Sequence, residues 1–508
     1  MSEPYYITTA IAYPNGRPHI GHAYEAIATD AIARFQRLMG RDVRLITGTD
    51  EHGLKMAQTA RNAGRETLEF ADEMSSYFKD MCATLNISHD NFMRTTDARH
   101  HAASIALWKA MEASGDLYLD RYEGWYSVRD EAYYADDEVT GGEGEQKLSP
   151  QGTPVEWTVE ESWFFRLSKY QDQLLAHYRD NPDFIRPDSR KNEVLRFVEG
   201  GLRDLSVSRT SFDWGVPVPG SPGHVMYVWV DALTTYLSGI GYPDTDGDFS
   251  KFWPADVHII GKDIVRFHAV YWPAFLMSAG LPLPKQIFGH GFILARDGAK
   301  MGKSAGNAAD PLELAERYGV DQFRYFLLRE VSFGQDGSWS EEAIVTRCNA
   351  ELTNGLGNLA QRCLSMIYKN FDGKLPSALA DRGPEIDALW AHLNAQQAMA
   401  SLDISRAIEH LRNGVDMTNK FFAEKAPWTA IESPRAQDTL YRTAEAIRRL
   451  AIAHRWIIPT SCDAILDQLS IPQNEKYRNF GAILEHQLQP GSIINEPIGV
   501  FPRLKVAV

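Results

Sequence analysis

The sequence predicts an α/β fold: a parallel-sheet domain that is split by an inserted α+β domain and followed by an all-α bundle. Strand-like and helix-like patterns alternate near the N-terminus and again after residue 216, which is typical of a parallel sheet covered by helices. The stretch between them is rich in aromatic residues and short strand-like pieces. After residue 349 apolar residues recur at helical spacing over long stretches. We therefore expect segments at 1–115, 116–215, 216–348 and 349–508.

The first segment contains two strand-and-helix pairs. Residues 5–13 are mostly β-branched or aromatic, and the turn sequence Pro14-Asn15-Gly16 follows them. Apolar residues then return every three or four positions. The patterns predict strands at 5–13 and 43–47 and helices at 19–39 and 71–85. Ligands of parallel sheets bind at the carboxyl ends of the strands, where the polar turns at 14–16 and 48–53 fall.

The patterns after residue 216 predict further strands and then long helices. Apolar, β-branched runs predict that the parallel sheet resumes with three more strands, at 225–230, 257–260 and 287–294. Helical spacing predicts long helices at 349–370, 385–423 and 434–458. The C-terminal segment should therefore be a bundle of helices.

Composition excludes several classes of protein. The chain of 508 residues has 52 Lys and Arg against 67 Asp and Glu, a net charge of −15, which argues against non-specific coating of nucleic acid or anionic membrane. None of the 4 cysteines belongs to a Cys-x-x-Cys pair, so a disulfide scaffold or a cysteine-rich zinc site is not expected. We see neither a signal peptide nor a membrane span and predict a cytoplasmic protein.

Two motifs combine cations or imidazoles with glycine. His19 and His22 flank Gly21 where a strand and turn give way to a helix, whose N-terminus favours anions such as nucleotide phosphates. Two loop histidines, or a metal-binding pair, are the alternatives. Lys300 and Lys303, with glycines around them, can close over a polyphosphate and neutralise a leaving pyrophosphate. A solvated surface turn is the alternative for this second motif.

Together the two motifs resemble the signatures of the class I aminoacyl-tRNA synthetases. Gly302 stands in the second motif where serine is usual, which leaves both lysines in place. Within that class the sequence resembles the methionyl-tRNA synthetase family. Further matching segments are AYPNG at 12–16, GTDEHG at 48–53, YVWVDA at 227–232, GKDIVRFH at 261–268 and APW at 426–428.

The resemblance implies a Rossmann-like catalytic domain, a connective insert and an anticodon-binding bundle. It implies that methionine and ATP, as its Mg²⁺ complex, form methionyl-adenylate and pyrophosphate. Methionine then passes to the 3′ end of tRNA(Met), initiator tRNA included. The motif positions assign catalysis to His19, His22, Lys300 and Lys303, and ATP binding to the same four residues with Gly21, Gly261 and Asp263.

The resemblance also implies a pocket for methionine. Asp50 is suited to pair with the ammonium group, and Arg209 is suited to orient Asp50. For Trp229 and Tyr236, seven residues apart, core packing of a helix face is the alternative. The full predicted set is Ile11, Ala12, Tyr13, Asp50, Arg209, Trp229, Ala232, Leu233, Tyr236, Ile264 and His268.

The insert departs from the family pattern. Many relatives carry zinc knuckles there, whereas this chain has Ser127 and Asp130 where a cysteine pair would stand. A hydroxyl and a carboxylate do not make a tetrahedral zinc site without thiolates or histidines. We therefore predict no structural zinc and no other bound metal site, and expect aromatic packing to hold the insert together.

The resemblance places anticodon recognition in the bundle. Asn354, Asn358 and Arg362 recur every four residues on one helix face, and Trp428 is suited to stack on a base. For the two asparagines and Arg362 the alternative is a solvated helix face, and for Trp428 it is a core residue at the end of a helix. Candidates for phosphate contacts are Arg442, Arg448, Arg449 and Arg455, and for at least half of them a solvated or ion-paired face is the alternative.

Two other functions remain open on sequence alone. One is a synthetase for another aliphatic or thiol amino acid, although the insert is small for an editing domain. The other is a non-catalytic RNA-binding paralogue, against which the two intact phosphate motifs argue. We further predict a monomer.

Overall fold

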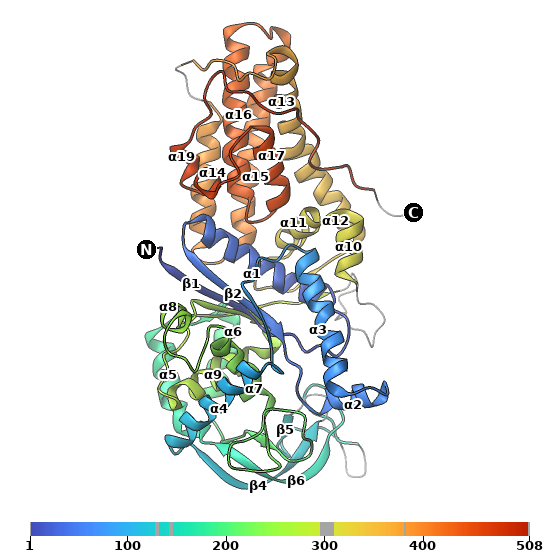
Figure 1. The fold of residues 1–508 in the computed structure, drawn as a ribbon, viewed down its shortest axis with the longest axis vertical. Helices are drawn as coiled ribbons and strands as arrows, with labels where there is room; N and C mark the ends of the chain where they lie inside the picture. The colour runs from blue at the N-terminus through green and yellow to red at the C-terminus, as the bar shows by residue number, and fades with distance from the viewer. Residues whose placement is uncertain (1, 128–131, 142–145, 295–308, 380–382, 506–508) are drawn as a thin grey trace.

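The computed structural model describes the chain except residues 1, 128–131, 142–145, 295–308, 380–382 and 506–508. A sheet crosses the middle of the molecule, with an upright bundle of helices on one side and the inserted segment on the other (Figure 1). This arrangement is the α/β fold with a C-terminal bundle that the sequence predicts. The boundaries of the four segments stay a prediction.

The central sheet has six parallel strands in the order β3-β2-β1-β11-β12-β7. They are β1 (Pro4–Thr9), β2 (Asp42–Thr49), β3 (Asn91–Arg94), β7 (Ile185–Arg186), β11 (Val257–Gly261) and β12 (Ile287–His290). The first strand ends at Thr9, four residues before the predicted end. Beyond it the amide of Ala10 still donates to Ile259 (N···O 3.0 Å) and that of Ala12 to Gly48 (N···O 2.9 Å), so the chain stays at the sheet edge.

The strands are joined by helices. The N-terminal ones are α1 (Ile20–Leu38), α2 (Leu54–Asn62), α3 (Thr67–Thr84) and α4 (Ala98–Ala113). Most of α1 is buried, because one side packs on the sheet and the other meets the bundle (Figure 1). The predicted helices at 19–39 and 71–85 correspond to α1 and α3.

The inserted segment is built on an antiparallel sheet in the order β5-β4-β6-β8. Its strands are β4 (Leu117–Ser127), β5 (Ala132–Tyr134), β6 (Glu156–Phe165) and β8 (Leu205–Ser206), with α5 (Gln171–Asp180) and α6 (Asp188–Glu199) beside them. Trp125 meets Trp157 edge to face, with ring centroids 5.3 Å apart, and Tyr118 stacks on Phe164. Residues 185–186 leave the insert to form β7 of the central sheet.

The strand predicted at 225–230 does not join the parallel sheet: its first half forms a separate antiparallel pair, and its second half is not a strand. β10 (Val225–Met226) pairs with β9 (Ser208–Arg209), and α7 (Val228–Ser238) begins two residues later. The run at 225–230 is short and apolar, and such a run does not distinguish a buried helix from a buried strand. The polar residues of α7, which recur at helical spacing from Asp231 to Ser238, lie beyond it. Further helices are α8 (Asp248–Phe252), α9 (Trp272–Ser278), α10 (Pro311–Tyr318) and α11 (Val320–Glu330). The remaining strands, β13 (Ile293–Leu294) and β14 (Gly337–Ser338), pair with each other.

The bundle contains a hairpin where one helix was predicted at 385–423. The chain breaks at Leu402, which has a φ of 57°, and Asp403 caps the second helix by accepting from the amide of Arg406. The bundle helices are α12 (Glu341–Arg347), α13 (Asn358–Asn370), α14 (Glu385–Met399), α15 (Ile404–Lys425), α16 (Pro434–His454) and α17 (Pro459–Gln468), followed by the short α18 (Glu475–Arg478) and α19 (Ala482–Glu485). None of the helices described has the length and apolar character required to cross a membrane.

Candidate active site

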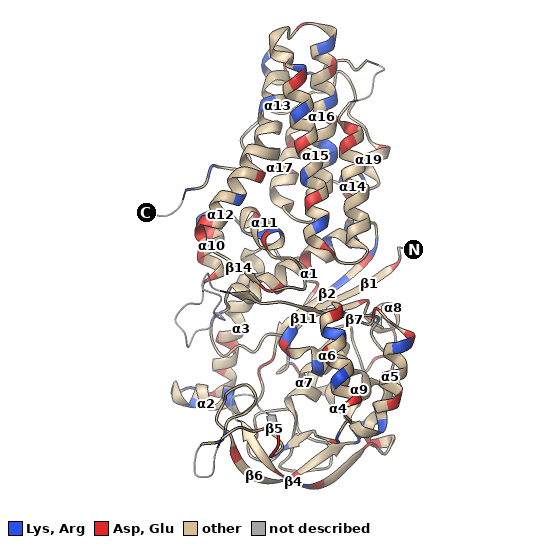
Figure 2. Ribbon diagram, turned by 180° about the vertical axis from the view of Figure 1, so that it is seen from behind, with Lys and Arg blue, Asp and Glu red and all other residues tan. Residues whose placement is uncertain are grey.

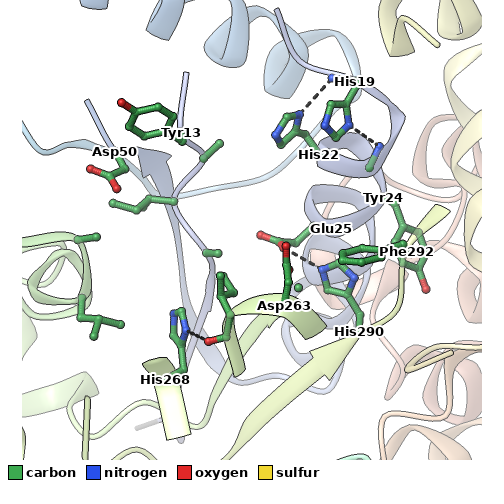
Figure 3. A pocket seen from close by; sticks show the side chains of 18 of the residues that line it. Tyr13, His19, His22, Tyr24, Glu25, Asp50, Asp263, His268, His290 and Phe292 are labelled. Carbon is green, nitrogen blue, oxygen red and sulfur yellow. Dashed lines mark hydrogen bonds and ion pairs between the residues drawn. The ribbon is translucent and has the colours of Figure 1, made fainter. Parts of the chain in front are cut away.

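A cavity of about 510 Å³ opens at the carboxyl ends of β1, β2, β11 and β12. Figure 3 shows it from close by, with the α1 histidines at one end and His268 at the other. Its walls come from segments far apart in the chain, which meet because parallel strands end at one edge. It is lined by fifteen predicted site residues: Ile11, Ala12, Tyr13, His19, Gly21, His22, Asp50, Trp229, Ala232, Leu233, Tyr236, Gly261, Asp263, Ile264 and His268.

The two histidines cap helix α1. His19 is the N-cap residue, and its Nδ1 accepts from the amide of Gly21, while Nδ1 of His22 accepts from the amide of His19 (both N···N 3.1 Å). The rings stack with centroids 3.9 Å apart. Because Nδ1 is an acceptor in both rings, each neutral imidazole carries its proton on Nε2. The pair therefore combines two N–H donors with the positive end of a helix dipole, which suits an anion.

Gly21 is required by this stacking. A Cβ at residue 21 would lie 2.9 Å from Cε1 of His19, so any larger residue would displace the ring. Gly261, the last residue of β11, has a similar role, because a Cβ there would lie 2.8 Å from a carboxylate oxygen of Asp263. Both glycines let a cavity-lining polar side chain sit against the backbone.

The opposite end of the cavity is apolar and aromatic. Trp229 on α7 stacks on Phe267 with ring centroids 3.8 Å apart, and His268 meets the Trp229 ring edge to face. Ala232, Leu233 and other α7 side chains complete this wall. The alternative of core packing is therefore only half right for α7: its residues are largely buried, but several of them also line the cavity.

Tyr236 and His268 form a neutral polar pair within the apolar wall. The Tyr236 hydroxyl lies 2.7 Å from Nε2 of His268, and Nδ1 of His268 lies 2.9 Å from the carbonyl oxygen of Ile264. The carbonyl only accepts, so Nδ1 carries the proton and Nε2 accepts from Tyr236. Burial lowers the pKa of His268 to about 4 and raises that of Tyr236, so both groups are uncharged at neutral pH.

Asp50 is placed by the sheet edge. It directly follows β2, it is 7% exposed, and its amide donates to the carbonyl oxygen of Ala12 (N···O 2.8 Å). Arg209, by contrast, is not among the described residues that line the cavity. Its guanidinium donates to the Ser206 hydroxyl and the Ser208 carbonyl oxygen and lies over the Tyr227 ring. The predicted Arg209–Asp50 pairing stays a prediction.

Sequence reasoning missed one polar pair in the cavity. His290 Nε2 lies 2.8 Å from the Glu25 carboxylate, and its Nδ1 lies 2.8 Å from the Gly291 carbonyl oxygen. Burial alone would lower the pKa of His290, but the hydrogen bond and charge of Glu25 raise it above its ordinary value. The positions of the two residues in the sequence could have predicted this pair. Glu25 follows His22 by one helical turn, and His290 is the last residue of a strand of the parallel sheet.

Lys300 and Lys303 lie outside the described residues, so their predicted contact with phosphates stays a prediction. Ser127 is described, and its hydroxyl lies 2.7 Å from that of Thr153, while Asp130 is not described. Among the described residues no group of three or more His, Cys, Asp and Glu side chains is arranged to hold a metal ion. The predicted absence of zinc therefore remains untested.

Two of the predicted anticodon residues, Arg362 and Trp428, meet in the bundle, and the predicted helix face is not one straight helix. A π-helical stretch, Cys348–Gly357, with a kink at Gly355 separates Asn354 from α13, which begins at Asn358. Both asparagines are exposed. The guanidinium of Arg362 lies 5.3 Å from the ring centre of Trp428, which is 44% exposed.

The four arginines proposed for phosphate contacts are instead ion-paired, and three of them are buried. Arg442, Arg448 and Arg449 are at most 6% exposed, and each pairs with a carboxylate on its own helix, Asp438 or Glu445. Arg455 pairs with Asp463 and Glu475. Figure 2 shows the same mixture of basic and acidic residues along the bundle helices. The ion-paired alternative is therefore correct for α16, because these side chains hold the bundle together.

Comparisons with known proteins identify the family of this chain. The family described as tRNA synthetases class I (M) matches residues 5–364, and the anticodon binding domain of methionyl tRNA ligase matches residues 380–506. Methionine–tRNA ligase of Brucella suis is 55% identical over 99% of this chain and 98% of its own length. That of Mycobacterium bovis is 55% identical over the same shares.

A solved structure is similar over the whole chain. Mycobacterium tuberculosis methionyl-tRNA synthetase in complex with methionyl-adenylate has 54% sequence identity and a TM-score of 0.94, covering 99% of this chain and 100% of that one. The apo form of the same enzyme has a TM-score of 0.88 and 51% identity. With both family models matched along one chain, and this identity over its full length, the chain belongs to the methionine–tRNA ligase family of class I synthetases.

Proposed function

We propose that the cavity is where this methionine–tRNA ligase binds methionine and ATP and joins them. One observation carries the assignment: a single cavity is lined by the stacked histidines of α1, by Asp50 and by the Tyr236–His268 pair. The histidines suit phosphates, and Asp50 together with the neutral pair suits an amino acid with an apolar, polarizable side chain.

Methionine would lie with its ammonium at Asp50 and its side chain along α7. A buried carboxylate favours a cation, and the neutral Tyr236–His268 pair leaves no charge near the thioether. Ile11, Ala12, Tyr13, Trp229, Ala232, Leu233 and Ile264 would complete the pocket. Arg209 would not contact methionine from within the cavity. It would act indirectly, through its contacts with Ser206, Ser208 and Tyr227.

ATP would lie between α1 and the end of β11. The Nε2–H groups of His19 and His22 would donate to phosphate oxygens, and Asp263 would face the ribose. The methionine carboxylate attacks the α-phosphorus, the adenylate forms and pyrophosphate leaves. Positioning and charge neutralisation lower this barrier, to which Lys300, Lys303 and a Mg²⁺ ion travelling with ATP would contribute.

Transfer to tRNA completes the reaction. The terminal ribose hydroxyl attacks the adenylate carbonyl and AMP leaves. The Arg362–Trp428 pair, with Asn354 and Asn358 nearby in the chain, would read anticodon bases of elongator and initiator tRNA(Met) by stacking and hydrogen bonding. Arg362 lies on α13 of the bundle, whereas the cavity is lined by residues at the ends of the central strands and on α1 and α7.

Amino-acid-dependent exchange between ATP and pyrophosphate tests the proposal. The exchange is measured with each of the twenty amino acids, and methionine alone should support it. Exchange driven by isoleucine, valine or cysteine would indicate a different synthetase, and no exchange at all would indicate a non-catalytic relative.

A second assay separates the anticodon surface from the cavity. Trp428→Ala should lower the kcat/KM of tRNA aminoacylation on the order of tenfold or more, since loss of one base stack costs about 1–3 kcal/mol. It should leave ATP–pyrophosphate exchange unchanged. Intact aminoacylation by Trp428→Ala would show that this tryptophan does not bind the anticodon.

A further inference from the structure

A buried carboxylate lies directly behind the amino-acid wall of the cavity. Asp231, on α7, has no exposed surface, and histidines from two other segments hold its oxygens. Nδ1 of His52 lies 2.6 Å from one oxygen, and Nε2 of His100 on α4 lies 2.6 Å from the other. His100 also contacts the hydroxyls of Ser104 and Ser238, so it is fixed independently of Asp231.

The carboxylate is ionised despite its burial. Burial alone would raise the pKa of Asp231, but His52 and His100 hold it far below its ordinary value. A carboxylate accepts hydrogen bonds and does not donate them, so both histidines direct N–H groups at Asp231. Such charge-assisted bonds have strict geometry, and breaking one leaves a buried charge only partly compensated.

His52 connects this carboxylate to the segment that carries Asp50. Only one residue, Glu51, separates the two, and its buried side chain is held by the Arg94 guanidinium at 2.7 and 2.8 Å. Trp214 Nε1 donates to the Glu51 carbonyl oxygen (N···O 2.6 Å). The Asp50 segment is thus held on one side by Arg94 and Trp214, and on the other by Asp231.

Asp231 sits within the cavity-lining part of α7. Trp229 is two residues before it, Ala232 and Leu233 follow it directly, and Tyr236 is one turn further on. The His52–Asp231 hydrogen bond therefore directly joins the two walls proposed to hold the opposite ends of methionine. The α1 histidines and Asp263, proposed to hold ATP, lie on neither wall.

We propose that Asp231 is a positioning residue, which through His52 sets the distance between Asp50 and the α7 wall and thereby the fit of methionine. This inference rests on the proposed assignment of Asp50 to the methionine ammonium. It deepens that assignment, because it names the bond that keeps the ammonium site and the side-chain pocket at the spacing of one amino acid.

Two substitutions of His52 test the bond itself. His52→Leu removes the donor, whereas His52→Asn keeps an N–H group at the position of ring Nδ1. His52→Leu should raise the KM for methionine on the order of tenfold in ATP–pyrophosphate exchange. It should change the KM for ATP by less than about twofold, since the ATP side does not depend on the bond. His52→Asn should recover most of the methionine KM, and failure to recover would overturn the proposal.

His100→Leu is the matched control. It also removes one of the two donors to Asp231, but none of the described residues that line the cavity lies on α4. We expect its methionine KM to rise by less than that of His52→Leu, because His100 does not link Asp231 to the Asp50 segment. Equal increases for His52→Leu and His100→Leu would mean that only the buried charge matters, which contradicts the proposal. If His52→Leu does not fold, His52→Gln replaces it, because its amide nitrogen falls at ring Nε2.

Asp50→Asn separates failure of this inference from failure of the site assignment. If Asp50→Asn raises the methionine KM while His52→Leu does not, the bond to Asp231 is not a positioning device and the assignment of Asp50 stands. If Asp50→Asn leaves the methionine KM unchanged, the ammonium site is wrong and the inference falls with it.

Discussion

At the scale of single residues, the histidine pair of α1 departs from ordinary helix chemistry. Serine, threonine, aspartate and asparagine are the preferred N-caps, yet here two imidazoles complete the reciprocal capping hydrogen bonds. The arrangement uses Nδ1 of each ring for the backbone and leaves the protonated Nε2 for other partners. Local rules are broken most often where a site requires it.

Gly21→Ala should lower adenylate formation without lowering stability. The new Cβ would displace the His19 ring, while alanine improves helix propensity by about 1 kcal/mol over glycine. ATP–pyrophosphate exchange and urea unfolding, measured on the same preparation, check both parts. A variant with full exchange activity would show that the stacked geometry of His19 is not needed.

Buried neutral histidines predict a loss of stability in acid. Burial lowers the pKa of His268, His392 and His454 to about 4 each, below the ordinary 6.5. The unfolded chain therefore binds more protons than the native chain between these values. The free energy of unfolding should fall as pH drops from 6.5 to 4, by about 1.4 kcal/mol per pH unit for each group.

His392→Leu isolates one of these groups. Urea unfolding of wild type and variant is compared at pH 7 and pH 5. Between pH 7 and pH 5 the free energy of unfolding should fall further for the wild-type protein than for the variant. The difference between the two falls should approach about 1.4 kcal/mol for each pH unit below 6.5, the contribution of one histidine. Parallel losses would mean that His392 takes up no extra proton on unfolding.

At the scale of elements, helix ends decide where functional side chains stand. Helix α15 ends at Ala426 in the left-handed conformation, with φ 41° and ψ 56°, and its amide donates to the Phe422 carbonyl oxygen. Pro427 cannot continue the helix, and Trp428 follows, edge to face with the Phe422 ring. This ending brings the tryptophan next to Arg362 on another helix.

Ala426→Gly should stabilise the protein by about 1 kcal/mol, because glycine has no Cβ to disfavour the left-handed conformation. Ala423→Gly is the control, since Ala423 is exposed inside the same helix and glycine there should cost about 1 kcal/mol. Urea unfolding measures both. Destabilisation by both substitutions would contradict the expected relief of strain at residue 426.

At the scale of the whole molecule, a buried ion pair connects the helix α1, next to the central sheet, with the helices on the bundle side. Arg324 on α11 contacts Asp30 on α1 at 2.6 Å, and both side chains are completely buried. The same guanidinium donates to the carbonyl oxygens of Leu85 and Ile457. Burial alone would raise the pKa of Asp30, but Arg324 and then Arg34 lower it to about 2. The helix that carries the site histidines is thereby bonded to the bundle side.

Arg324→Leu should destabilise the protein by about 3–5 kcal/mol, because it leaves buried polar groups without their cation. Arg34→Leu is the control, since Arg34 contacts the same carboxylate from a side chain that is 20% exposed, and its loss should cost less. Urea unfolding compares the two. Equal losses would mean that burial of Arg324 adds nothing to the pair.

Local patterns in the sequence determined much of this protein. The alternation of strands and helices predicts the parallel sheet, and the position of His19 and His22 after a strand and turn predicts a shared site at the sheet edge. Both depend on neighbours along the chain, whose spacing is set by backbone geometry. Family resemblance added the cavity residues, and all of the described ones line the cavity except Arg209.

Only the tertiary structure decided the rest. The structure shows that Val228–Ser238 is a helix with most of its residues buried, and that α16 arginines pair with carboxylates inside the bundle rather than facing solvent. The Glu25–His290 and His52–Asp231 pairs join segments 265 and 179 residues apart. Such pairings leave no periodic signal, because they are set by which faces the sheet and helices bring together. The sequence thus determined the elements and the motifs, and the packing determined which polar groups meet.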